Sequence, residues 1–409
     1  MFDLVYQYKV TCSCDTPLRV GAADGDTRNV LRLPDNTPFI QGASLAGVMR
    51  AWLEAKSDNE ILVSELFGDQ KKAGTLMISD GLFERTSKAY TRMRLRINPQ
   101  TATAATKAKF DVAHIAAGSV FVFTVTWLGT AEPNGSHLRT VEAIEQMLSA
   151  LQCKPLGAQK TNGFGKLSIN AERCILNMYE VEERKNWLEN SFQYEKCHLP
   201  TLVSNDRVTF ELVGNFDRIL VKSGHGDQAN TMARQRVQSN VCEQYPLIPG
   251  SSIKGVLRNR CAVIADAVGI SPDYITQMFG AEGTIGKFVF YDAVMKNKTT
   301  REISRIRINK HTGQVCRHAL LTEEPVSAQT VTIRIEGLND PAMCGLLYCA
   351  LRDLTVGHIG IGSGQSFGRG LISNACLKIN NETIDLGKKT PAVVSDWLTA
   401  LKGVCAYGN

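Results

Sequence analysis

The chain has 409 residues, of which 44% are hydrophobic and 21% are charged, and it carries a formal net charge of +6. This composition is typical of a globular protein, excludes a disordered or collagen-like chain, and at this length predicts two or more domains. The small positive charge permits a polyanionic partner without requiring one.

From the sequence we expect no membrane-spanning segment, no signal peptide and no disulfides. The longest apolar stretch, Gly118 to Gly129, is too short to cross a membrane and alternates like a strand. The first ten residues lack the features of a signal peptide, so we expect a cytoplasmic protein with no membrane partner. The 12 cysteines are dispersed, which favours free thiols over disulfides or structural zinc.

The first half of the chain predicts a mixed domain. Alternation of apolar and polar residues indicates strands at residues 2–12, 75–83 and 119–127. We expect Ser44 to cap a helix whose apolar positions have helical spacing; these are Leu45, Val48, Met49, Trp52 and Leu53. A second helix is predicted at 138–152, and a glycine-rich loop at 157–167 leads into a closing strand.

The second half predicts the same elements in the same order. Strands are expected at 207–214, 286–295 and 329–335, and helices after Ser252 and at 340–355, before a glycine-rich loop at 360–370. The order β-α-β-β-α-β is that of a ferredoxin-like, RRM-like α+β fold. Each half should therefore form an antiparallel sheet with helices on one face.

An internal duplication supports this division. PFIQGASLAGVMR at 38–50 is repeated as PLIPGSSIKGVLR at 246–258, 208 residues later. Four further blocks match in the same order at separations of 203 to 212 residues: 66–68 with 278–280, Asp80 with Asp292, 94–98 with 305–309, and 157–167 with 360–370. In the last block Phe164 matches Phe367. We predict two tandem domains, 1–203 and 204–409.

Basic residues are concentrated at equivalent places in the two repeats. Residues 84–109 and 296–318 each contain seven Lys or Arg and one acidic residue. In each RxRxN segment, alternation places both arginines on one face of a strand: Arg94 and Arg96, and Arg305 and Arg307. A solvated strand face is the simpler interpretation of one copy, but two copies favour binding to a phosphate backbone.

The glycine-rich loops can bring backbone amides close to a ligand. Lys166 and Arg369 would add charge, and Phe164 and Phe367 a stacking surface, although each loop could be a simple turn. No GxGxxG, P-loop or GxSxG spacing is present, so we expect no nucleotide cofactor and no serine hydrolase chemistry. The loop carboxylates Asp26 and Asp227 are, by spacing alone, typical of turns.

The PxIxGxSxxGxxR block, the RIxxxT segment and the GxGxxxxxFGRG loop, in this order, resemble the RAMP superfamily. More narrowly, they resemble the RNA-binding backbone subunits of type III CRISPR effector complexes, and the duplication resembles a fusion of two such subunits, as in the type III-D branch. The resemblance implies binding to a CRISPR guide RNA, cleavage of complementary target RNA, and assembly with other subunits. It also implies protruding thumbs at about 84–118 and 296–328.

The resemblance further implies individual site residues. Contacts to the guide backbone would come from Ser44, Arg50, Lys166, Ser252, Lys254, Arg258 and Arg369. The cleaving aspartate would lie sixteen residues before Gly42, which is Asp26. The same count from Gly250 gives Arg234, so Asp227 is the less certain counterpart. The first repeat also carries Ala46 where the second carries Lys254.

The implied chemistry is modest, because RNA carries its own 2′-hydroxyl nucleophile. One carboxylate at Asp26 holding Mg²⁺ or another divalent cation near the phosphate could suffice. Three alternatives stay open: a guide-RNA scaffold that does not cleave, a guide-processing endonuclease, and a metabolic enzyme with duplicated ferredoxin-like domains that binds a small anion.

Overall fold

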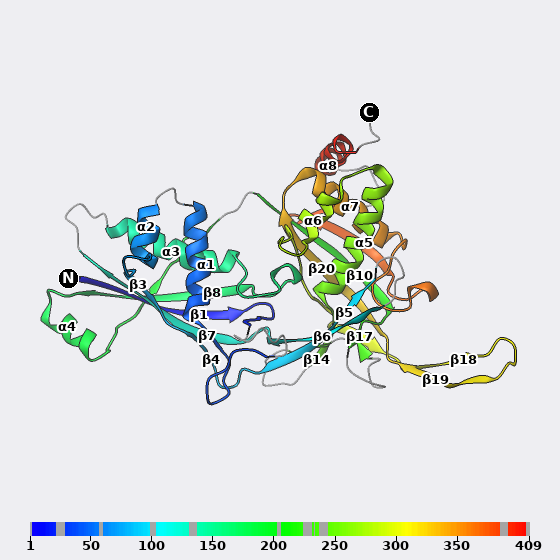
Figure 1. Ribbon diagram of the computed structural model, residues 1–409, viewed down its shortest axis with the longest axis horizontal. Coiled ribbons are helices and arrows are strands. Elements are labelled where there is room, and N and C mark those ends of the chain that lie inside the picture. The colour runs from blue at the N-terminus through cyan, green and yellow to red at the C-terminus, as the bar shows by residue number, and fades with distance from the viewer. Residues whose placement is uncertain are drawn as a thin grey trace.

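The computed structural model describes residues 2–21, 29–56, 60–98, 104–130, 137–202, 206–223, 231–232, 234–236, 244–384 and 392–405. These residues form two antiparallel sheets, each with helices and its own apolar core (Figure 1). The predicted α+β fold with two ferredoxin-like domains is confirmed. The expected boundary between residues 203 and 204 falls outside the described residues.

The first sheet is centred on β1 (Leu4–Cys14), which pairs with β7 (Val120–Gly129) and β8 (Leu167–Asn177). Its order is β2-β4-β7-β1-β8-β9, with β2 at Phe39–Ile40, β4 at Gly81–Phe83 and β9 at Glu195–Cys197, while β3 (Leu76–Ile78) also pairs with β7. The helices are α1 (Gly42–Lys56), α2 (Glu60–Phe67), α3 (His137–Cys153) and α4 (Val181–Leu188). The apolar face of α1 packs into the core through Leu45, Met49 and Leu53.

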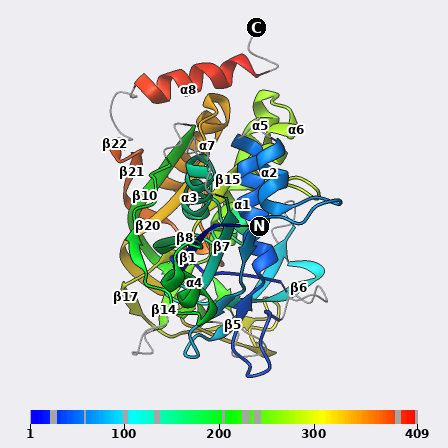
Figure 2. The same ribbon diagram turned by 90° about the vertical axis from the view of Figure 1, so that its left-hand side faces the viewer.

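The second sheet repeats this arrangement around β10 (Arg207–Ile219), which pairs with β20 (Val326–Leu338) and β21 (Ile372–Ile379). The order is β15-β20-β10-β21-β22, with β15 at Phe288–Phe290 and β22 at Glu382–Ile384, and β17 (Asn297–Thr300) also pairs with β20. The helices are α5 (Gly250–Val268), α6 (Pro272–Phe279), α7 (Pro341–Thr355) and α8 (Ala392–Gly403). Short strands β11 (Lys222–Ser223), β12 (Thr231–Met232), β13 (Arg234–Arg236), β14 (Gln244–Ile248) and β16 (Ala293–Val294) complete the domain. In Figure 2, α5 to α8 lie on the upper side of the molecule and β5, β14 and β17 on the lower side.

Each predicted basic thumb is a two-stranded hairpin. In the first domain β5 (Ala89–Ile97) pairs with β6 (Ala104–Ile115), and in the second β18 (Ile303–Ile308) pairs with β19 (Val315–Glu323). The β5–β6 hairpin reaches the second domain, whereas β18–β19 extends away from the body of the protein (Figure 1).

The equivalent helices α1 and α5 begin two residues before the serines expected to cap them. Their first residues, Gly42 and Gly250, donate their backbone N–H to Asp80 Oδ1 and Asp292 Oδ1, at 2.7 Å in both cases. The prediction of serine caps is therefore wrong. Carboxylates distant in sequence satisfy these N–H groups, and Ser44 and Ser252 lie within the first helical turns.

The two glycine-rich loops also align differently from the sequence prediction. Leu156 N donates to Gly165 O in the first loop, and Ile361 N donates to Gly370 O in the second, both at 2.9 Å. These bonds are 205 residues apart, whereas the sequence pairing used 203. The short helical turns η1 (Lys160–Asn162) and η3 (Gln365–Phe367) show the same separation.

This register changes which side chains are equivalent. Phe164 corresponds to Arg369, not to Phe367, and Lys166 corresponds to Leu371. The sequence alignment placed the shared Phe-Gly pairs opposite each other. The backbone hydrogen bonds that close the loops give a different alignment, shifted by two residues.

Candidate nucleic-acid interface

The first domain's thumb and glycine-rich loop pack directly against the second domain. Arg92 Nη1 lies 2.9 Å from Asp292 Oδ2, and both side chains are only 8% exposed. Lys166 Nζ lies 3.3 Å from Glu336 Oε1. The carboxylate of Asp292 thus holds both the start of α5 and an arginine from the other domain. Two ion pairs and a helix start are joined at this contact.

Gly163 lies close to the backbone of the second domain and provides a stability prediction. It has φ +78°, and a Cβ added there would lie 2.7 Å from both Phe290 O and Tyr291 Cα. We expect Gly163→Ala to destabilise the domain contact by roughly 2–4 kcal/mol, from left-handed strain and overpacking. Gly368, its structural equivalent, has the same φ with nothing within 4 Å. In calorimetric unfolding, Gly368→Ala should therefore cost clearly less; equal losses would contradict the close-packing explanation.

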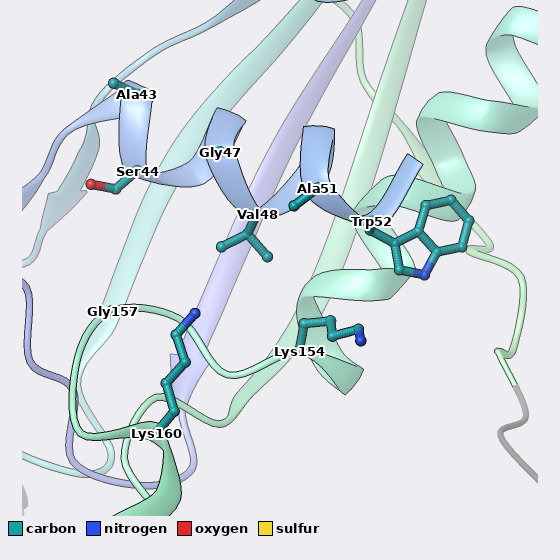
Figure 3. A pocket seen from close by; sticks show the side chains of 9 residues that line it. All are labelled: Ala43, Ser44, Gly47, Val48, Ala51, Trp52, Lys154, Gly157 and Lys160. Atoms are coloured by element: carbon teal, nitrogen blue, oxygen red, sulfur yellow. The ribbon is translucent and has the colours of Figure 1, made fainter. Parts of the chain in front are cut away.

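A cavity of about 420 Å³ lies between the first turns of α1 and the glycine-rich loop (Figure 3). One wall is α1, including Ser44, Gly47 and Trp52, and the other side carries Lys154, Gly157 and Lys160. Figure 3 shows the side chain of Lys160 extending from the loop toward α1. Gly47 leaves room here, because a Cβ at this position would meet nothing within 4 Å.

A second cavity of about 500 Å³ lies on the other side of the same loop, against the second domain. Its charged lining residues are Lys160, Lys254 and Arg258, and Gly157 and Lys160 border both cavities. Among the residues that the structure describes, no acidic side chain lines either cavity. The two cavities therefore form a discontinuous, cationic surface along α1, the loop and α5, which is suited to a polyanion.

Lys254 is held in this second cavity by its Nζ, which donates to Thr161 Oγ1 at 2.8 Å. Burial, aided by the nearby charges of Arg258 and Arg94, lowers the pKa of Lys254 to about 8. Burial likewise lowers the pKa of Lys160, with a contribution from Lys154. An incoming phosphate would relieve this repulsion, so these ammonium groups are poised to gain an anionic partner.

This pKa predicts that the affinity of the second cavity for a polyanion depends on pH. Above about pH 8 the free protein loses this proton, so the affinity for a polyanion such as single-stranded RNA should fall by up to about tenfold between about pH 7 and pH 9. Lys254→Arg keeps the charge throughout and should flatten the profile. Binding titrations at constant salt measure this; an identical pH profile for both proteins would contradict a role for Lys254.

Of the predicted site residues, the structure brings Ser44, Lys254 and Arg258 to the cavities. Arg94 lies behind them, where its Nη1 donates to Gln159 Oε1 at 2.7 Å and its guanidinium packs over Phe164. Other predicted residues lie elsewhere: Arg50 pairs with Glu54 on α1, Ser252 lies in the first turn of α5, and Arg96 and Arg307 are exposed on the hairpins.

Two residues that were predicted to contact the ligand, Phe164 and Arg369, are buried. Phe164 is 1% exposed beneath the guanidinium groups of Arg92 and Arg94, so it offers no stacking surface. Arg369 is 4% exposed and donates to Glu323 Oε2 at 2.6 Å. The two residues occupy the same buried position in the glycine-rich loops of their domains.

Two further predicted cations are partly neutralised. Arg305 donates to the buried Glu323 at 2.7 Å and packs over Phe367. Lys166 pairs with Glu336 and lies 5.5 Å from the ring centroid of Tyr291. Phe367, at 49% exposed, is the one predicted aromatic that is open to solvent in the described structure.

The predicted catalytic residues Asp26 and Asp227 lie outside the described residues, as do the loops 22–28 and 224–230 that contain them. Described residues that precede these two segments are hydrogen-bonded to the glycine-rich loops. Ala158 N donates to Arg19 O, and Ser363 N donates to Leu220 O, both at 2.8 Å. Among the described residues, no cluster of His, Cys, Asp and Glu could hold a metal ion.

The sequence predictions missed Lys154 and Lys160. Lys160 belongs to the glycine-rich loop that was recognised in the sequence, but its structural equivalent in the second domain is Gln365. A search for basic residues that recur in both repeats therefore does not find it. Lys154 follows the end of α3, where only the fold brings it to α1.

Two ferredoxin-like domains in tandem, with cation-lined cavities beside a glycine-rich loop, define the class of structure. The RAMP superfamily model matches residues 11–168 and 212–373, one match in each domain, and the chain belongs to this superfamily. The resemblance of both repeats to the RAMP superfamily is thereby confirmed.

A search of curated proteins finds no match. Among the solved structures that match is one titled as Type III-B Cmr-beta bound to cognate target RNA, at 15% identity and a TM-score of 0.34. The match covers 42% of this chain and 61% of that one. No helix among the described residues is both long and apolar enough to cross a membrane.

Proposed function

We propose that this protein is a guide-RNA-binding backbone subunit of a type III CRISPR effector complex, and that it cleaves complementary target RNA. The observation that carries the proposal is the pair of cavities whose charged lining, in the described part of the chain, is lysine and arginine, and which extends from α1 across the glycine-rich loop to α5. Membership of the RAMP superfamily in both domains supports it.

Cleavage is assigned to Asp26, with Asp227 as a second, less well matched candidate. The hydrogen bond from Ala158 to Arg19 supports this assignment, because it anchors the approach to loop 22–28 beside the loop that borders both cavities. Mg²⁺ takes one or two carboxylates and completes its shell with water and phosphate oxygens, so the one carboxylate of Asp26 would be enough to hold such an ion. The bound ion would stabilise negative charge on the phosphate.

The chain's own residues would position the RNA. Lys160 and Lys254 would hold phosphates on the two sides of the loop. Fixing the RNA backbone in this way would limit its motion, which helps an in-line attack by the 2′-hydroxyl on the adjacent phosphate.

Substituting the loop aspartates tests the catalytic assignment. Asp26→Ala should lower target cleavage by roughly 10²–10³-fold, the size typical of losing one catalytic electrostatic group, and leave guide binding unchanged. Asp24→Ala, in the same loop, is the matched control and should retain cleavage. If the Asp26→Ala/Asp227→Ala double variant binds guide RNA and still cleaves the target, the catalytic assignment fails. If the wild type itself binds guide RNA but does not cleave the target, the protein is a non-cleaving scaffold.

A further inference from the structure

The side chain of Lys254 places an amine in a cavity whose charged groups are cations. Its Nζ donates to Thr161 Oγ1 at 2.8 Å, which fixes the amine against the glycine-rich loop. Arg258 lines the same cavity from α5, Lys160 lines it from the loop, and the charge of Arg94 acts on the amine from β5. Among the described residues, no carboxylate is paired with this amine to keep it protonated.

This environment makes Lys254 a nucleophile near neutral pH. Burial and the two arginines lower its pKa to about 8. At about pH 7.5 roughly a quarter of such amines are unprotonated, compared with about 0.1% for an ordinary exposed lysine. Attack on a carbonyl carbon requires the free lone pair, so Lys254 should react faster than exposed lysines, although its lower basicity offsets part of the gain.

The cavity also favours one class of acylating reagent. Its volume of about 500 Å³ is large enough for a small anion, and Lys160 and Arg258 provide positive charge beside the amine. An acyl phosphate carries its negative charge on the leaving group, one oxygen atom away from the reactive carbonyl carbon. Binding of this phosphate by Lys160 and Arg258 would bring the carbonyl carbon into the cavity of Lys254 and stabilise the charge that the leaving phosphate gains.

We propose that Lys254 is a modification site, acylated by small acyl phosphates that bind in the second cavity when RNA does not occupy it. The lone pair of Nζ attacks the acyl carbon, a C–N bond forms, and the C–O bond to phosphate breaks. Phosphate leaves with the electron pair of that bond, and water takes the proton that the amine loses. The product is an uncharged amide, so the cavity loses one positive charge.

The modification would link the chemical state of Lys254 to RNA binding. Bound RNA would cover the amine and protect it, and the acylated protein would bind RNA up to about tenfold less tightly, as when the amine loses its proton. This consequence rests on the proposed function. Acylation of the free protein does not, because it requires only the cavity, its cations and the fixed amine.

Time-resolved mass spectrometry of the full, RNA-free chain in millimolar acetyl phosphate tests the proposal. At about pH 7.5, Lys254 should be acetylated roughly tenfold faster than the exposed Lys71 and Lys72. Its rate should level off above about pH 8, while the rates at the two exposed lysines keep rising. Inorganic phosphate should slow acetylation of Lys254 but not of Lys71, and unfolding in urea should abolish the difference between the lysines.

Arg258→Gln is a direct test of the phosphate-binding step. Removing this charge weakens binding of the reagent and raises the protonated fraction of Lys254, so acetylation there should slow by at least roughly fivefold. Lys160→Gln should give the same result without removing the hydrogen bond from Arg258 to Gly280 O. Lys402→Gln, on α8, removes the same charge outside the cavity and should leave the rate unchanged.

Two outcomes would overturn the proposal. One is acetylation of Lys254 no faster than that of Lys71. The other is an equal preference for Lys254 when the reagent is the uncharged N-hydroxysuccinimidyl acetate, because Lys254 would then be a reactive amine without a site for acyl phosphates. If acetylation is selective and slowed by phosphate, but guide RNA does not protect Lys254, the modification site stands and the proposed RNA contact at this cavity fails.

Discussion

Replacing Arg92 by alanine should weaken the contact between the two domains by about 3–5 kcal/mol, because it leaves Asp292 as a buried charge without its partner. Among the described residues, the N–H of Gly250 would be the remaining hydrogen-bond donor to the Asp292 carboxylate. Calorimetry should show the unfolding transitions of the two domains moving apart, since their coupling is lost. Arg96→Ala, four residues along the same strand but exposed, should change little.

A double-mutant cycle separates this ion pair from simple loss of packing. Arg92 also packs over Phe164, at 5.5 Å from the ring centroid, so Arg92→Ala removes more than one contact. Asp292→Asn keeps the oxygen that Gly250 uses. If the two substitutions are additive, Arg92 and Asp292 are not coupled, and the account of the domain contact fails.

Removing the four cations of the cavities should have the largest effect on RNA binding. The residues are Lys154, Lys160, Lys254 and Arg258. Single-stranded RNA contributes a salt slope of about 0.7 per neutralised phosphate, so the glutamine variant should lose about 3 from the slope of log K against log salt. Its affinity at low salt should fall by at least roughly 10²-fold.

The control for this variant removes the same charge elsewhere. Lys71, Lys72, Lys185 and Lys402 are exposed and line neither cavity. Replacing these four by glutamine should leave the salt slope nearly unchanged. Equal losses in the two variants would mean that RNA responds to net charge and not to the cavities.

Much of the fold could be predicted because the relevant signals are local and occur twice. Alternation identified β1 and β10, and helical spacing identified the buried face of α1. The starts of α1 and α5 were misplaced because their caps are Asp80 and Asp292, which are close only after folding. Helix caps made by distant side chains leave no local sequence pattern.

The candidate site was predicted less completely, because its residues were chosen mainly for occurring at matching positions in both repeats. Recurrence identified Lys254 through its block, but it overlooked Lys160, which has no basic counterpart. It also paired Phe164 with Phe367, although the first is buried and the second exposed. The exposure of a side chain depends on which residues pack over it, and sequence identity between the repeats does not give this information.

Photo-crosslinking of guide RNA that carries 4-thiouridine, followed by mapping of the modified peptides, tests the central claim most directly. The structure predicts cross-links in residues 154–162 on the glycine-rich loop and 254–258 on α5, with further sites near Ser44 on α1. Cross-links confined to the outer strands β9 and β22 or to α8, with none at the glycine-rich loop, would contradict it.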